Sequence, residues 1–307
     1  MSSCETWRVM GQECPSWWHP GTVSALKLPR PKLPRPPARL ARPPHPSHTH
    51  FTLLPPRARP ADESHANFSQ YSARFAGVAA HAGARSGSGS ALYYSFNMGL
   101  VHWVMFSTEV YWAQPAVVEA QINWLKKDLA AANANRAQTP WIIAAGHKSW
   151  YMDTTYCSGA SCYANATWFD SLLHEAGVDL YFVGHMHEYR RLVPAHGTAN
   201  ATDLACASGA ERNAVFTNCK YLATIVTGAP GNPEAQPPDC GGPAPHDPQQ
   251  PTLTCSRNYG FGFLQVHNAT HASWQWDTAL PIAGSPDPVS PDSLLVVAEQ
   301  HGPRSWV

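Results

Sequence analysis

The chain of 307 residues is 44% hydrophobic and only 14% charged, so it can bury a sizeable core and is not globally disordered. Its 21 basic and 21 acidic residues cancel, which argues against a nucleic-acid binder that works through bulk positive charge. No apolar stretch is long enough to span a membrane. These totals favour a protein with a folded core.

Residues 1–60 form a low-complexity segment rich in proline and arginine. Prolines recur from Pro29 to Pro60, and no acidic residue lies between Glu13 and Asp62. Proline lacks a backbone donor and fixes φ, so we expect this segment to be extended or disordered. The stretch Leu33-Pro34-Arg35-Pro36-Pro37 is either a ligand for an SH3- or WW-type partner or part of a linker, and a linker is the commoner outcome.

Residues 61–280 carry the patterns of a folded α/β domain. The expected elements are a hairpin over 92–106, a helix over about 115–135, a buried strand over 141–145, a helix over 169–176 ended by Gly177, and a buried strand over 179–183. This alternation indicates a mixed sheet flanked by helices. Further strands are expected at 221–227, 260–266 and 272–276. Residues 281–307 are expected to be a loose tail.

Two of the expected buried strands end in glycine followed by histidine. His147 follows the strand over 141–145, and His185 and His187 follow the strand over 179–183. Ligands of open α/β sheets bind at the carboxyl ends of strands, so these histidines should meet at one edge. In an extended segment, His185 and His187 would point to the same side. A lone strand-end histidine is usually a surface residue, but three in this pattern favour a metal site.

The same segments resemble those of purple acid phosphatases. Gly184–Arg190 resembles the G-H-x-H segment of that family, and Gly146–Tyr151 resembles its preceding histidine motif, with Ser149 where the family usually has proline. Asn67–Phe75, Thr227–Asn232 and Tyr259–Trp276 are similar to flanking family segments, in the same order. The resemblance implies part of a metallophosphoesterase α/β sandwich, with mixed sheets flanked by helices.

The resemblance also implies roles for the three histidines. His147 and His185 would bind a divalent metal (zinc, manganese or iron), and His187 would bind a ferric ion. The family's other ligands come from upstream D-x-G, G-D-x-x-Y and G-N-H-E motifs. The dipeptides Gly-Asp and Asn-His do not occur in this sequence, and its one Asp-x-Gly, Asp239-Cys240-Gly241, lies downstream.

By resemblance, the function is hydrolysis of small phosphate monoesters at a dinuclear metal site. Because the upstream motifs are missing, we expect this chain to be a truncated or mis-joined product with impaired activity. The alternatives are natural loss of the first half, a non-catalytic relic or partner-binding protein that uses the proline-rich arm, and a mononuclear histidine metal site.

Eight cysteines and four glycosylation sequons favour an oxidising, secretory environment. The sequons lie at Asn67, Asn165, Asn200 and Asn268. The first residues nevertheless show no signal peptide. We expect Cys157 and Cys162 to pair across a short loop, whereas Cys206–Cys219 and Cys240–Cys255 are only two of the many pairings open to these cysteines.

Overall fold

A computed structural model describes residues 68–110, 115–148, 169–196, 201–210, 213–229, 231, 252–280 and 291–303. The proline-rich segment with its expected SH3- or WW-type ligand lies outside these residues. So do Cys157, Cys162, Cys240 and three of the four sequon asparagines. Among the described residues, no helix is both long and apolar enough to cross a membrane.

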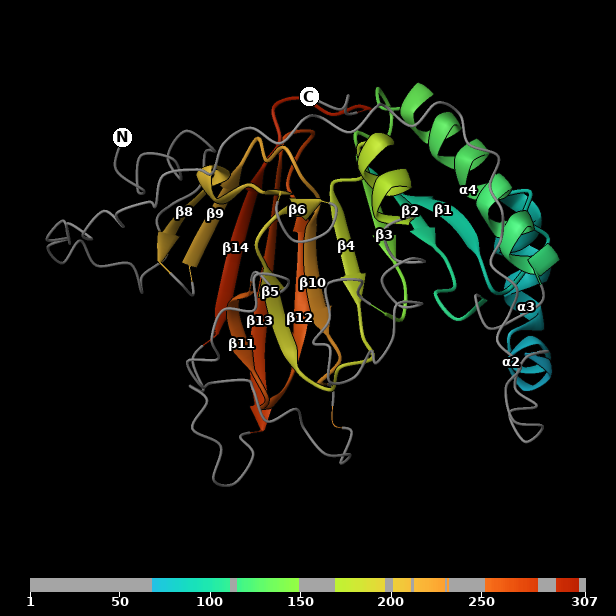
Figure 1. The fold of residues 1–307 in the computed structure, drawn as a ribbon, viewed down its shortest axis with the longest axis horizontal. Helices are drawn as coiled ribbons and strands as arrows, with labels where there is room; N and C mark the ends of the chain where they lie inside the picture. Colours follow the sequence, from blue (N-terminus) through green and yellow to red (C-terminus); the bar gives the residue numbers. More distant parts are fainter. Residues whose placement is uncertain are drawn as a thin grey trace, which may run out of the picture. The chain divides into compact units, whose positions relative to one another are not determined.

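The larger sheet has seven strands (Figure 1). Their order is β1 (Tyr94–Met98), β2 (Val101–Met105), β3 (Trp141–Ala145), β4 (Leu180–Val183), β10 (Ala223–Thr227), β5 (Tyr189–Leu192) and β11 (Thr252–Ser256). Strands β2, β3, β4 and β10 run parallel, whereas β1, β5 and β11 pair antiparallel with their neighbours. The mixed sheet confirms the expected fold class. It also confirms the expected hairpin, with its turn at Gly99 and Leu100 rather than at residues 97–99.

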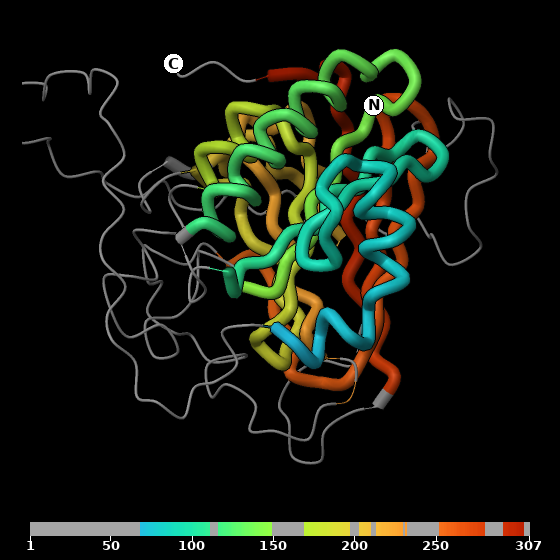
Figure 2. Tube along the Cα trace, turned by 90° about the vertical axis from the view of Figure 1, so that its right-hand side faces the viewer, coloured from blue at the N-terminus to red at the C-terminus, as the bar shows by residue number. Residues whose placement is uncertain are grey.

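Two helices cover one face of this sheet. Helix α4 (Pro115–Ala134) confirms the expected helix, and apolar side chains at helical spacing, including Leu125 and Leu129, are fully buried. The helix over 169–175 lies beside α4 (Figure 2), with Leu173 in the same core, and Gly177 ends it at φ +67°. Three short turns precede β1: α2 (Ser69–Arg74), α3 (Ala76–Val78) and η2 (Ala79–Gly83).

A second sheet packs on the opposite face of the first. Its order is β12 (Tyr259–Val266), β13 (His271–Leu280), β14 (Asp292–Val297), β9 (Asn213–Thr217) and β8 (Ala207–Ala210). Trp274 and Trp276 enter the core between the sheets together with side chains of β3 and β4. A Cβ at Gly262 would lie 2.0 Å from the Trp274 ring, so glycine in β12 makes room for the indole.

Strand β14 corrects the expected loose tail over 281–307. It pairs with β13 and, in parallel, with β9. Its first residue, Asp292, is fully buried and accepts hydrogen bonds from Arg191 Nε at 2.9 Å and Nη2 at 3.0 Å. Strand β14 is therefore an internal part of the second sheet, and Arg191, which donates to Asp292, lies on β5 of the first sheet.

The remaining short elements lie near one disulfide. They are β6 (Ala195–His196), β7 (Ala201–Thr202) and the 3₁₀ turn η4 (Leu204–Cys206). Cys206 is bonded to Cys219, which confirms that pairing. Asp203 lies within 4.8 Å of both sulfurs, but sulfurs already joined in a disulfide do not supply thiolate ligands for a metal.

Candidate metal centre

Strands β3 and β4 deliver His147 and His185 to the same edge of the larger sheet. The strands are parallel neighbours. Their hydrogen bonding continues past both ends, because Gly146 N donates to Phe182 O at 3.0 Å and Gly184 N donates to His147 O at 3.0 Å. Both histidines therefore leave the carboxyl edge side by side, as the strand–Gly–His pattern predicts.

The two imidazoles face each other at short range. His147 Nε2 lies 3.1 Å from His185 Nδ1, and the ring planes cross at 72°. Two nitrogens that bind one tetrahedral Zn²⁺ at about 2.0–2.1 Å lie roughly 3.3 Å apart. The observed spacing fits two ligands of one divalent ion.

The backbone at His185 is in the left-handed region, with φ +60°. This conformation costs a non-glycine residue about 1–3 kcal/mol and is concentrated at functional sites. It also corrects the expectation that residues 185–187 are extended, because the chain bends here between β4 and β5. Because the chain bends here, the two-residue alternation of an extended strand does not determine where His187 lies relative to His185.

The environment keeps both histidines available as neutral ligands. Partial burial lowers the pKa of His185 to about 4, helped by the neighbouring His147 and Lys148. Burial also lowers the pKa of His147, against the opposing charge of Glu109. A neutral imidazole offers a lone pair to a metal, so protons compete with a metal at His185 only as the pH falls towards about 4.

His187 lies near this pair. Its charge lowers the pKa of both other histidines. Among the described residues, however, no group of three metal-binding side chains within 4.8 Å of one another includes His147 or His185. The described donor set therefore fits part of the coordination of one divalent ion and does not by itself complete a two-metal centre.

Glu109 is a residue of this edge that the sequence reasoning missed. It follows β2, which runs parallel to β3, so its carboxylate reaches the same edge as His147. Its Oε2 accepts from Lys148 Nζ at 3.1 Å, and Lys148 N donates to Thr108 Oγ1 at 3.1 Å. The polar run Ser107-Thr108-Glu109 after β2 could have indicated Glu109 as a candidate. The sequence analysis did not predict, however, that β2 and β3 pair in parallel.

The bend over 185–187 packs against Gly228, which lies in the loop that follows β10. Gly228 N donates to Glu188 O at 3.0 Å, and a Cβ at Gly228 would lie 1.9 Å from Met186 O. Contacts this short force the backbone to move, so only glycine fits beside the bend.

Replacing Gly228 by alanine should therefore displace the histidine bend. We expect a loss of about 1–3 kcal/mol in the free energy of unfolding, together with weaker Zn²⁺ binding. Urea unfolding and zinc titration measure both effects. Gly77→Ala is the matched control, because a Cβ there meets nothing within 4 Å. Equal behaviour of the two variants would show that the bend does not depend on Gly228.

Comparison with known proteins gives a consistent family signal. Residues 67–189 match the calcineurin-like phosphoesterase family, and residues 222–279 match the family described as iron/zinc purple acid phosphatase-like protein C. Acid phosphatase type 7 from Danio rerio is 31% identical over 258 residues, covering 78% of this chain and 53% of that protein. Purple acid phosphatase 15 from Arabidopsis thaliana is 32% identical over 239 residues, covering 68% of this chain and 40% of that protein.

A solved structure of a purple acid phosphatase from yellow lupin seeds has the same fold. It superposes with a TM-score of 0.50 at 18% identity, covering 67% of this chain and 32% of that one. The chain spans about half the length, or less, of the curated relatives described above.

Proposed function

Because the chain belongs to the purple acid phosphatases of the calcineurin-like phosphoesterase superfamily, we propose that it carries part of a two-metal site that hydrolyses phosphate monoesters. The observation that supports this most directly is the pair of imidazole nitrogens 3.1 Å apart at the carboxyl edge of β3 and β4. This pair lies inside the segment that matches the phosphoesterase family.

The proposal assigns a separate task to each side chain of the edge. His147 and His185 would hold a divalent ion (zinc, manganese or iron), and His187 would hold a ferric ion. A metal pair supplies Lewis acidity and a hydroxide nucleophile near neutral pH. Lys148, whose side chain is 29% exposed, would add positive charge that attracts the phosphate, while Glu109 fixes the direction of its ammonium group.

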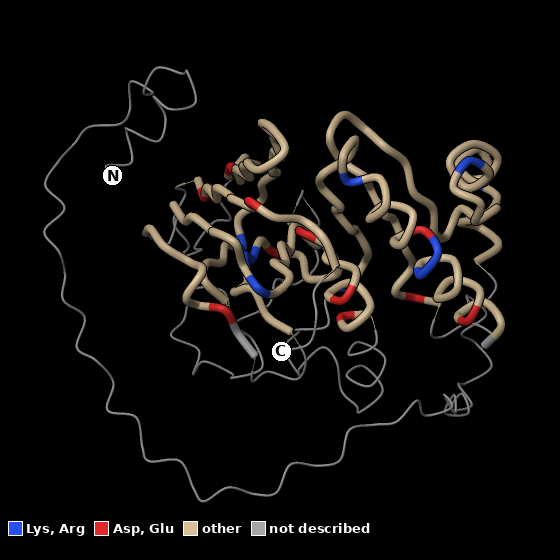
Figure 3. The backbone as a smooth tube through the Cα atoms, turned by 90° about the horizontal axis from the view of Figure 1, so that it is seen from above, with Lys and Arg blue, Asp and Glu red and all other residues tan. Residues whose placement is uncertain are grey.

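We place the protein in the secretory pathway. The Cys206–Cys219 disulfide favours an oxidising environment. The sequon residue Asn268 is exposed in the turn between β12 and β13, as an asparagine that carries a glycan must be. Lysine and arginine positions are interspersed with acidic positions along the described chain (Figure 3), which suits a small anionic substrate better than a nucleic acid.

A substrate comparison tests the proposed reaction. The chain would be joined to the upstream half of acid phosphatase type 7 from Danio rerio, loaded with iron and zinc, and assayed on p-nitrophenyl phosphate and bis(p-nitrophenyl) phosphate. We expect faster hydrolysis of the monoester. A preference for the diester would contradict the proposed substrate class and leave a metal-dependent phosphoesterase of another kind.

A further inference from the structure

The side-chain amide of Gln121 on helix α4 holds the segment that follows β2. Gln121 is fully buried. Its Oε1 accepts from Ser107 N and its Nε2 donates to Ser107 O, both at 2.9 Å. Ser107 lies just beyond β2, where the chain leaves the larger sheet. One amide therefore binds both backbone groups of this residue, which fixes the direction in which the chain leaves the strand.

Val110 fastens the other end of this segment to the same helix. Its side chain is fully buried in a cluster with Val118 and Ile122 of α4. Residues 107–110 are therefore held on α4 by a polar contact at one end and by an apolar contact at the other. Between these ends, Ser107 Oγ accepts from Glu109 N at 3.2 Å, a local turn contact that fixes the backbone of Glu109.

The segment brings Thr108 and Glu109 to Lys148 at the carboxyl edge of β3. Thr108 Oγ1 accepts from Lys148 N and donates to Glu109 Oε1, both at 3.1 Å. Glu109 Oε2 accepts from Lys148 Nζ at 3.1 Å. The hydroxyl of the fully buried Tyr181 also donates to Lys148 O at 2.7 Å. Both the backbone and the ammonium group of Lys148 are thus held next to His147.

Water competes with the ion pair between Lys148 and Glu109. Their side chains are 29% and 33% exposed, and partly exposed pairs contribute little stabilisation of their own. Such a pair keeps one geometry only where the surrounding structure holds one of its members. For Glu109 that support runs through Ser107 to Gln121, so helix α4 determines where the Lys148 ammonium lies.

We infer that Gln121 is a positioning residue of this edge: through Ser107 it holds Glu109 where Glu109 directs the Lys148 ammonium towards the phosphate group of the substrate. The inference rests on the proposed function, in which Lys148 attracts that phosphate. Because Gln121 is fully buried, it acts through these neighbours and not by touching the substrate. A lysine that is ordered beforehand loses less side-chain entropy when it binds an anion, so Gln121 contributes to phosphate affinity.

The first test probes the Lys148 ammonium in the full chain without metal or substrate. The protein is treated briefly with acetic anhydride, and mass spectrometry gives the acetylation of Lys148 relative to that of Lys127, which is exposed on α4. We expect Gln121→Met to raise this ratio by about twofold to fivefold, as for release of a partly exposed ion pair. Glu109→Gln removes the charge of the acceptor itself and should raise the ratio by a similar factor.

A second substitution of Gln121 keeps the test decisive if the methionine variant does not fold. Gln121→Asn retains a buried amide but is one methylene shorter, so it cannot bind both backbone groups of Ser107. It should also raise the acetylation ratio at Lys148. Circular dichroism identifies the variants that fold. An unchanged ratio in the folded Gln121 variants would overturn the inference, whatever the outcome for the proposed function.

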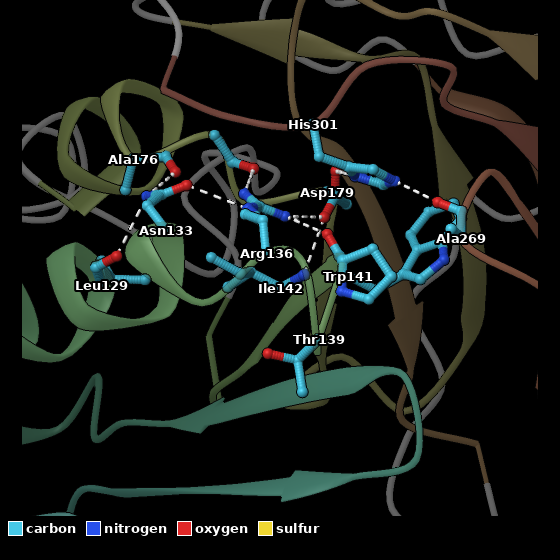
Figure 4. Close-up of polar contacts among 12 residues, drawn as sticks. Leu129, Asn133, Arg136, Thr139, Trp141, Ile142, Ala176, Asp179, Ala269 and His301 are labelled. Carbon is cyan, nitrogen blue, oxygen red and sulfur yellow. Dashed lines mark hydrogen bonds and ion pairs between the residues drawn. The ribbon is translucent and has the colours of Figure 1, made fainter.

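The matched control is Asn133→Leu on the last turn of the same helix. Asn133 Nδ2 also donates to backbone carbonyls, to Leu129 O at 3.1 Å and to Ala176 O at 2.7 Å (Figure 4). Ala176 precedes β4, so these contacts lie at the opposite end of that strand from His185. This variant loses comparable hydrogen bonds and should leave the acetylation ratio at Lys148 unchanged. An equal rise in the control would show that the ratio reports only general loosening, and would contradict the inference.

The second test separates the role of Gln121 from the proposed function. In the joined protein of the substrate comparison, Lys148→Met should raise KM for p-nitrophenyl phosphate by about tenfold. Gln121→Asn should raise it by about threefold and leave kcat within about twofold, because phosphate binding is weakened and the reacting groups are not changed.

The double variant shows whether Gln121 acts through Lys148. In the Lys148→Met background, Gln121→Asn should raise KM no further. Additive effects of the two substitutions would overturn the inference and leave the proposed function intact. Absence of monoester turnover in the joined protein would instead overturn the proposed function, while the acetylation ratio still decides whether Gln121 positions Lys148.

Discussion

The 307-residue chain alone is expected to show no phosphatase turnover above background, even when iron and zinc are supplied. Two metals about 3.5–4 Å apart concentrate positive charge, which carboxylate ligands normally offset. The candidate ligands His147, His185 and His187 are histidines, and an imidazole binds a metal in its uncharged form, so they would not offset this charge. Glu109, a carboxylate that the structure describes at the same edge, forms an ion pair with Lys148. Steady-state assays with p-nitrophenyl phosphate and metal analysis of the same sample measure the result.

Joining an upstream segment that carries the three missing motifs should rescue turnover. In that joined protein, His185→Ala should lower kcat by on the order of a thousandfold, since loss of a metal's Lewis acidity costs several kcal/mol. His81→Ala, on the exposed surface of η2, is the control and should keep full activity. Metal-dependent turnover of the 307-residue chain at ordinary enzyme rates would overturn the expectation and require ligands beyond these histidines.

The joined protein should also be more soluble. In the described sheet, β1 is an edge strand, and Phe96 and Met98 on it are 40% and 61% exposed. Open, apolar strand edges promote association between chains. Size-exclusion chromatography at matched concentrations compares the two proteins.

Replacing Asp292 by asparagine is expected to lower the free energy of unfolding by about 3–5 kcal/mol. Asp292 is fully buried, and its carboxylate accepts two bonds from Arg191, whose side chain is 1% exposed. It also accepts a hydrogen bond from the Tyr189 hydroxyl, which in turn accepts from Trp274 Nε1 at 3.3 Å. Asparagine would remove the negative charge that lies against the buried Arg191 cation.

The control for this variant is Asp277→Asn on the neighbouring strand β13. Among the described residues, the Asp277 carboxylate accepts side-chain hydrogen bonds from the exposed Gln275 amide, at 3.0 and 3.1 Å, so the change should cost less than about 0.5 kcal/mol. Combining Asp292→Asn with Arg191→Met also removes the buried positive charge, so the double variant should recover part of the lost free energy of unfolding. Urea unfolding of the four proteins checks this. Equal costs for the two Asp→Asn variants would show that the buried pair does not hold the sheets together.

Local sequence patterns were enough to predict two helices and the buried strands β3 and β4. Helix α4 and the helix over 169–175 have apolar residues at helical spacing, and β3 and β4 are short apolar runs. These patterns can be recognised within a short stretch of sequence, because each depends only on which side chains of a single helix or strand are buried. The glycine–histidine steps after β3 and β4 therefore placed two of the candidate ligands, His147 and His185, at a common edge from the sequence alone.

Only the tertiary structure decided how distant segments complete this frame. Asp292 lies within the expected tail over 281–307, and only the structure places it against Arg191, 101 residues earlier in the chain. His301 meets Asp179 across 122 residues, and Glu109 reaches the histidine edge only because β2 pairs with β3 in parallel. A buried charge is stable only beside its partner. Neither member of such a pair shows this in its own neighbourhood of the sequence, so β14, the contact between Asp179 and His301 and the place of Glu109 follow only from the assembly of the sheets.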